Sequence, residues 1–203
     1  MNELAHVLAK FGLGHGAPSP IDVRLSRHGG LTRLWAELGY KIIVEVGTEQ
    51  GKFAAEICRD NPTAKLYCVD PYMAYDRYEQ HQTQEKLERF YADAQERLKG
   101  RNVTFLRCTS LAAAADCTLP IDAVFIDANH AYEYVKADIE AWAPKVRKGG
   151  MVCGHDYKLE GQERKPLPFG VIQAVNEYVA THAIAPLFIL RGDKCPSWAF
   201  VKA

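Results

Sequence analysis

Acidic and histidine side chains follow two apolar runs of the sequence, and their types suit proton transfer and metal binding. Asp127 comes directly after the run AVFI, and His130 follows three residues later. His155 and Asp156 come directly after a second run, MVCG. Carboxylate oxygens bind hard divalent cations, and a histidine, whose reference pKa lies near neutral pH, can take a proton from a hydroxyl group. These four residues are candidates for a catalytic site.

A second candidate is the segment IIVEVGTEQG at residues 42–51, an apolar run followed by the pattern Glu-x-Gly-x-x-x-Gly. Glycines at such a turn let the backbone approach a ligand closely. The middle glycine of the dinucleotide pattern G-x-G-x-x-G is missing, and an acid stands where a phosphate would be repelled. The loop therefore favours a positively charged ligand without phosphate. Its candidate binding residues are Glu45, Gly47, Thr48, Gln50 and Gly51.

The elements that would position these residues alternate in type. Five short runs rich in β-branched residues are expected to be buried strands: 41–46, 65–70, 103–108, 121–127 and 150–156. Between them, apolar residues recur at helical spacing, as in Leu87, Tyr91, Ala94 and Leu98. This alternation predicts an α/β, Rossmann-like, doubly wound sheet that binds ligands at the carboxyl ends of its strands.

The two ends of the chain depart from this alternation. Residues 186–203 are two strand-like runs around a Gly-Asp turn, which predicts a C-terminal antiparallel hairpin at the edge of a mostly parallel, seven-stranded sheet. Residues 1–39 are expected to form a helical and loop cap, and residues 40–203 the Rossmann-like core. The whole chain is predicted to be a single domain.

Composition excludes several partners. The chain has 203 residues, with 25 Lys plus Arg balanced by 25 Asp plus Glu. No basic surface for nucleic acid or membrane is indicated. The N-terminus does not resemble a signal peptide, so we predict a cytoplasmic protein. The six cysteines form no CxxC pair and are interpreted as reduced thiols. Whether the protein forms a homo-oligomer is left open.

At the glycine loop the sequence resembles the class I S-adenosylmethionine-dependent methyltransferases, whose first motif is E/D-x-G-x-x-x-G. S-adenosylmethionine carries a sulfonium and no phosphate. The resemblance implies that Asp70, followed by Pro71 in LYCVDPY, accepts hydrogen bonds from the ribose hydroxyls. It places the adenine near the end of FLRCTS, so Thr109 and Ser110 are further candidates for cofactor binding. The C-terminal hairpin also matches the family.

The second constellation resembles a narrower group with I-D-x-x-H-x-Y and G-H-D-Y segments, related to metal-dependent O-methyltransferases of macrolide sugars. This resemblance covers roughly residue 40 to the C-terminus. It implies that Asp127 and Asp156 bind Mg²⁺ or another divalent cation, with His155 as a third ligand or a supporting group, and that His130 is the general base. Asp127 is also a candidate for contact with the cofactor. A purely structural role stays an alternative for each residue.

The sequence therefore predicts a methyltransferase that uses S-adenosylmethionine to methylate a hydroxyl of a small molecule or sugar, with metal assistance as an option. Two alternatives remain open: an NAD(P)-dependent oxidoreductase on a similar sheet, and a non-catalytic S-adenosylmethionine-binding protein. The long segment after Asp70 is a candidate lid, through Tyr72, Tyr75, Arg77 and His81, and the polar loop 159–170 is a candidate for substrate contacts.

Overall fold

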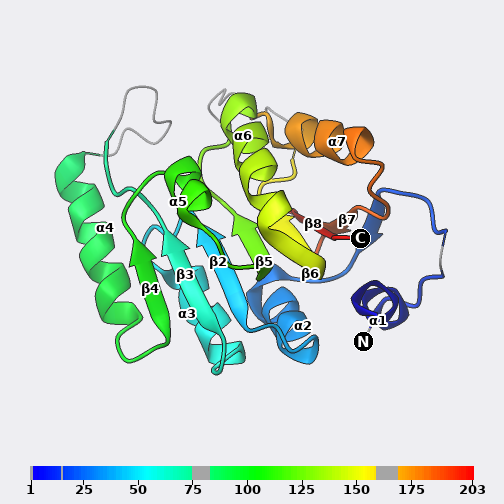
Figure 1. The fold of residues 1–203 in the computed structure, drawn as a ribbon, viewed down its shortest axis with the longest axis horizontal. Coiled ribbons are helices and arrows are strands. Elements are labelled where there is room, and N and C mark those ends of the chain that lie inside the picture. The colour runs from blue at the N-terminus through cyan, green and yellow to red at the C-terminus, as the bar shows by residue number, and fades with distance from the viewer. Residues whose placement is uncertain (1, 15, 75–82, 159–168) are drawn as a thin grey trace.

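The computed structural model describes residues 2–14, 16–74, 83–158 and 169–203. Its centre is an eight-stranded sheet with helices on both faces (Figure 1). The strand order is β1-β7-β8-β6-β5-β2-β3-β4, and only β8 runs antiparallel to its neighbours. The strands are β1 Ile21–Val23, β2 Ile42–Val46, β3 Lys65–Val69, β4 Val103–Leu106, β5 Ile121–Ile126, β6 Val146–Gly154, β7 Phe188–Leu190 and β8 Ser197–Val201.

Seven α-helices among the described residues cover the sheet: α1 Glu3–Lys10, α2 Thr32–Glu37, α3 Lys52–Asp60, α4 Gln84–Arg97, α5 Ser110–Asp116, α6 Tyr132–Trp142 and α7 Val171–Thr181. Short helical turns precede α2 (Arg27–Leu31) and follow α6 (Ala143–Lys145). One hydrophobic cluster packs α1, α2 and α3 against one face of the sheet, and a second packs α5, α6 and α7 against the other. Both faces are thus buried, as the apolar strands require.

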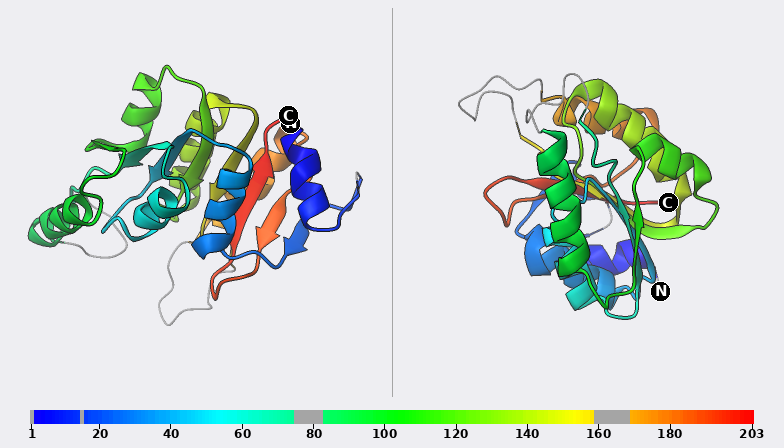
Figure 2. Two further views of the ribbon diagram at one scale, coloured as in Figure 1. Left: turned by 90° about the horizontal axis from the view of Figure 1, so that it is seen from below. Right: turned by 90° about the vertical axis from the view of Figure 1, so that its left-hand side faces the viewer.

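The predicted α/β class, the five parallel strands and the C-terminal hairpin are confirmed. The predicted number of seven strands is wrong, and so is the predicted place of the hairpin at the sheet edge, because the N-terminal segment supplies an eighth strand outside the hairpin. This strand, β1, pairs in parallel with β7, with Ile21 opposite Phe188, and lies beside the C-terminal hairpin (Figure 2). Three residues are too few for an alternating pattern, so this strand could not be recognised from the sequence. The division at residue 40 stays a prediction.

The parallel strands bring four chain segments to one edge of the sheet. The central strands β3, β2, β5 and β6 lie next to one another and end on the same side. The residues after them are therefore neighbours, although they lie far apart in the sequence.

No helix in the described part of the chain is long and apolar enough to cross a membrane.

Candidate active site

The glycine loop after β2 packs directly against the end of β5. Gly47 has φ +91°, and a Cβ built on it would lie 2.1 Å from the main-chain oxygen of Asp127. The Asp127 amide in turn donates a hydrogen bond to the main-chain oxygen of Val46, at 2.8 Å. Gly51 has φ +68° and is the N-cap residue of α3. Only glycine combines this backbone conformation with such a close approach.

Asp70, at the end of β3, is held beside the glycine loop. Its Oδ2 accepts a hydrogen bond from the amide of Glu49 and its Oδ1 one from the amide of Tyr72, each at 2.9 Å. Burial raises the pKa of Asp70, and the two amide hydrogen bonds oppose that shift. A carboxylate can accept about four hydrogen bonds, so acceptor capacity remains for two ribose hydroxyls. Asp70 and the following Pro71 lie at the end of β3, and their contact with the cofactor stays a prediction.

The Glu45 side chain is buried inside the protein and does not face an open ligand site. It lies at the end of β2, and its Oε2 has no hydrogen-bond partner among the described residues. Burial raises the pKa of Glu45 to about 8, so the group is largely uncharged at neutral pH. A role in bracing the glycine loop therefore fits Glu45 better than direct contact with a positively charged ligand. The buried Thr48 hydroxyl lies beside Glu45, and its interaction with that carboxyl opposes part of the rise in the pKa.

The other candidate cofactor residues lie at the start of helices or in the loop. Thr109 caps α5 by accepting a hydrogen bond from the Ala112 amide at 3.3 Å. Ser110 accepts one from the Trp142 indole at 2.9 Å. The main-chain oxygen of Gln50 accepts one from Arg97. These contacts fix the local backbone, and the roles of these residues in binding stay predictions.

The four residues predicted to act in catalysis or to bind metal come together at the ends of β5 and β6. The His130 Nε2 atom lies 3.0 Å from the Asp156 Oδ2 atom and 3.8 Å from the Asp127 Oδ1 atom. The His155 Nδ1 atom lies 3.2 Å and 3.7 Å from the same two oxygens. Asp156 has φ +55°, a conformation that non-glycine residues adopt rarely and that is found at functional sites.

Opposing effects set the charge of this cluster. Burial alone would lower the pKa of His130, but the carboxylates of Asp127 and Asp156 outweigh it and raise the pKa to about 10. Burial would raise the pKa of Asp156, but His130 and His155 hold it below its usual range. His130 is therefore protonated and Asp156 ionised at neutral pH. The His130 ring also stacks on Phe169, with ring centres 5.0 Å apart.

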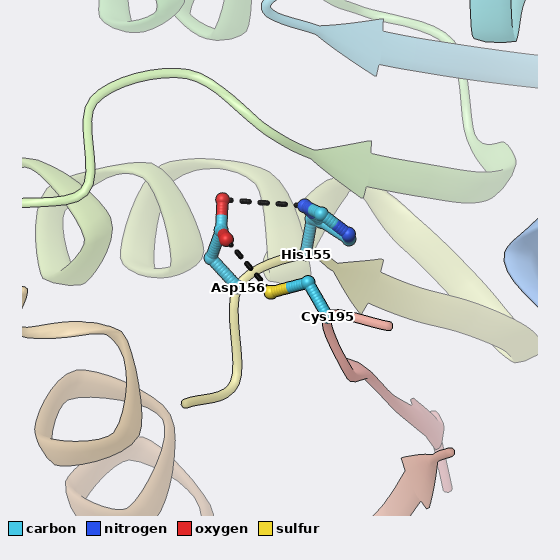
Figure 3. A group of neighbouring side chains, drawn as sticks. All are labelled: His155, Asp156 and Cys195. Carbon is cyan, nitrogen blue, oxygen red and sulfur yellow. Dashed lines mark hydrogen bonds and ion pairs between the residues drawn. The ribbon is translucent and has the colours of Figure 1, made fainter. Parts of the chain in front are cut away.

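Three further residues, which the sequence patterns did not single out for this site, contact the two carboxylates. The Arg27 Nη1 atom lies 2.7 Å from the Asp127 Oδ2 atom, and the Lys158 Nζ atom lies 3.4 Å from the Asp156 Oδ1 atom. The Cys195 thiol donates to the same Asp156 oxygen at 2.9 Å, with His155 on the other side of the carboxylate (Figure 3). Burial and Asp156 raise the pKa of Cys195 to about 12, so its thiol is protonated.

These contacts bear on the predicted metal. Ligand atoms of Asp127, His130 and Asp156 lie within 4.8 Å of one another, and so do those of His155, Asp156 and Cys195. The spacing would allow an ion. However, Mg²⁺ prefers oxygen ligands, and the two carboxylates already face the cations Arg27, Lys158 and protonated His130. In this arrangement the residues do not fit Mg²⁺, and the metal that the family resemblance implies is untested.

Two segments singled out from the sequence lie largely outside the described residues. Of the candidate lid, Tyr75, Arg77 and His81 are not described, and neither are residues 159–168 of the polar loop. The described Tyr72 is buried, and its hydroxyl donates a hydrogen bond to the main-chain oxygen of Glu49 at 2.9 Å. Tyr72, two residues after Asp70, therefore helps to hold the glycine loop in place.

The Rossmann-like sheet, the glycine loop and Asp70 together define a class I S-adenosylmethionine-dependent methyltransferase. The chain belongs to the methyltransferase domain family, whose model matches residues 44–157, more than half of its 203 residues. This assignment replaces the two alternatives, the oxidoreductase and the non-catalytic binding protein. It does not extend to the narrower group of macrolide sugar O-methyltransferases. A comparison with curated proteins found no match.

Solved structures of similar fold agree with this class. A Staphylococcus aureus protein assigned as a caffeoyl-CoA O-methyltransferase is 18% identical, with a TM-score of 0.63 over 97% of this chain and 91% of that chain. A Bacillus cereus O-methyltransferase in complex with S-adenosylhomocysteine is 19% identical, with a TM-score of 0.60 over 98% and 89%. The Streptomyces achromogenes O-methyltransferase TomG, of tomaymycin synthesis, in complex with S-adenosylmethionine, is 20% identical, with a TM-score of 0.57 over 100% and 91%. At these identities the likeness concerns the fold.

Proposed function

We propose that this methyltransferase transfers the methyl group to a hydroxyl of a small molecule or sugar. The observation that carries the proposal is the position of His130, between two carboxylates and at the same sheet edge as the glycine loop. A neutral hydroxyl is a weak nucleophile, so its methylation gains from a base that removes the proton. The O-methyltransferases of similar fold support the same acceptor class.

The residues present fit S-adenosylmethionine as the cofactor. The close packing of the loop at Gly47 and the remaining acceptor capacity of Asp70 are features that a bound nucleoside and amino acid would use. Bound S-adenosylmethionine supplies an electrophilic methyl group on its sulfonium. Gly47, Gly51 and Asp70 would hold and orient it, which fixes the direction from which the acceptor approaches.

His130 must lose its proton before it can act as a base. In the protein alone, Asp127 and Asp156 keep it charged. A cationic ligand beside Asp127 offsets part of that negative field and so lowers the pKa of His130. Binding of the cofactor would thereby prepare the base, while Asp156, at 3.0 Å, keeps the imidazole oriented.

This coupling gives a measurable pKa. We expect the His130 imidazole of the free protein to titrate near pH 10, well above the reference value for histidine. Sinefungin, which carries an amine in place of the sulfonium, should lower that pKa more than S-adenosylhomocysteine does. The measurement is a proton NMR titration, with the signal assigned by comparison with His130→Asn. A titration near the reference value, unchanged by either ligand, would contradict the coupling.

A second prediction concerns the metal. Because Arg27 and Lys158 already face the two carboxylates, we expect no saturable binding of Mg²⁺ and the same affinity for S-adenosylhomocysteine in Mg²⁺ and in EDTA. Calorimetric titration measures both quantities, and Mn²⁺ can replace Mg²⁺ in a parallel electron paramagnetic resonance titration. One-to-one binding that disappears in Asp156→Asn would instead establish the metal site.

The acceptor class is tested by incubating the protein with ¹³C-methyl S-adenosylmethionine and panels of phenols, catechols, sugars and primary amines. We expect methyl ethers, which the ¹³C chemical shift distinguishes from N-methyl products. Formation of S-adenosylhomocysteine provides an independent readout of turnover. Methylation of the amines alone would overturn the proposal of a hydroxyl acceptor and leave the methyltransferase class intact.

A further inference from the structure

An ion pair between Arg27 and Asp127 lies next to the glycine loop. The two side chains are only 18% and 24% exposed, and their charged atoms are 2.7 Å apart. The residues are separated by 100 positions in the sequence, so only tertiary structure brings them together. Gly47 packs against the main chain of Asp127, which puts the pair beside the loop that would hold the cofactor.

Arg27 is held in place by several contacts. Its main-chain amide and the Ser26 hydroxyl each donate to the Asp193 carboxylate at 2.6 Å. Asp193 belongs to the turn between β7 and β8, so the C-terminal hairpin fixes the segment before α2. The guanidinium also lies over the rings of Phe53 and Phe125, at 5.5 and 6.0 Å from their centres. The cation is thus preorganised at the site, unlike a mobile surface arginine.

The pair can bind both an anion, through further N–H donors of Arg27, and a cation, through the carboxylate of Asp127. The Arg27 Nη1 atom donates to Asp127 and its Nε to the His28 ring, at 2.7 and 3.1 Å. For Nη2, no partner is recorded in the part of the chain that the structure describes. A guanidinium has five N–H donors in a planar fork that suits a carboxylate. Asp127 is a carboxylate that can accept further hydrogen bonds.

We infer that Arg27 binds the carboxylate at the amino-acid end of S-adenosylmethionine, while Asp127, already a candidate for contact with the cofactor, receives the ammonium. The amino-acid end is a zwitterion, so its ammonium can face the Asp127 carboxylate while its carboxylate faces the Arg27 guanidinium. The two strands that end at Asp70 and Asp127 flank β2, so these residues follow strands about 10 Å apart. The nucleoside end at Asp70 and the amino-acid end at Asp127 would then span the glycine loop. The inference rests on S-adenosylmethionine as the cofactor.

Two ligands separate this role from a merely structural one. S-adenosylhomocysteine has the amino-acid end, and 5′-deoxy-5′-methylthioadenosine has the same nucleoside and thioether without it. We expect Arg27→Gln to weaken binding of S-adenosylhomocysteine about 10- to 100-fold, the usual range for a lost hydrogen bond to a charged group. Its affinity for methylthioadenosine should change less than about threefold, because that ligand does not reach Arg27.

Two further variants complete the calorimetric experiment. Arg24→Gln removes an exposed arginine three residues earlier in the same segment and should leave both affinities unchanged. Arg27→Lys keeps the charge and should retain part of the S-adenosylhomocysteine affinity, which also guards against a glutamine variant that folds poorly. Equal losses for both ligands in Arg27→Gln, or no loss for S-adenosylhomocysteine, would overturn the inference. If the wild-type protein binds neither ligand, the cofactor assignment itself fails.

Discussion

Gly47→Val is expected to lower the affinity for S-adenosylhomocysteine by more than about 100-fold. The first reason is conformational, because φ +91° is strongly unfavourable for a β-branched residue. The second is steric, because the Cβ atom would lie 2.1 Å from the Asp127 oxygen and 2.9 Å from the Ala128 Cα atom. The loop must therefore move away from the end of β5. That movement separates the glycine loop from Asp127, which we place at the amino-acid end of the cofactor.

Gly100→Val is the matched control for this variant. Gly100 also has a positive φ, +74°, but a Cβ there would meet no atom within 4 Å. It therefore carries the conformational cost without the collision and should bind S-adenosylhomocysteine like the wild type. Calorimetry gives the affinities, and circular dichroism with thermal melting reports whether each variant is folded. A folded Gly47→Val protein with retained affinity would refute the assigned role of the loop.

His130→Asn is expected to lower kcat for hydroxyl methylation by about 10²- to 10⁴-fold, the usual contribution of a general base. The variant removes the proton acceptor, while Asp70 and the glycine loop remain in place. Its affinity for S-adenosylhomocysteine should change by only a few-fold. The measurement is the rate of S-adenosylhomocysteine formation with an acceptor from the hydroxyl panel, at saturating S-adenosylmethionine.

His182→Asn provides the comparison for the His130 variant. His182 is exposed at the end of α7, where its ring stacks on Tyr178 and contacts the main-chain oxygen of that residue. Its replacement should leave kcat unchanged. If His130→Asn also retained full kcat, another group would have to take the proton, and the base assignment would be wrong. A loss confined to cofactor affinity would instead point to a positioning role for His130.

The sequence was sufficient to predict most of the fold and which acidic and histidine side chains meet at the ends of β5 and β6. Hydrophobic periodicity marked the five parallel strands and the helices that separate them. Since parallel strands joined by helices end at one edge of the sheet, Asp127 and His130 had to approach His155 and Asp156. The glycine spacing with Asp70 also identified the class of cofactor, because these are local signals.

Tertiary structure alone decided which groups surround that cluster and what charge it carries. Arg27 and Cys195 reach the carboxylates through the β1–β7 pairing and the β7–β8 turn, and no local pattern records such long-range contacts. Burial makes Glu45 largely neutral, and proximity to two carboxylates keeps His130 charged. The sequence by itself thus determined which reactive groups meet at the sheet edge. Their protonation and partners depend on distances and solvent exclusion, which only the folded chain sets.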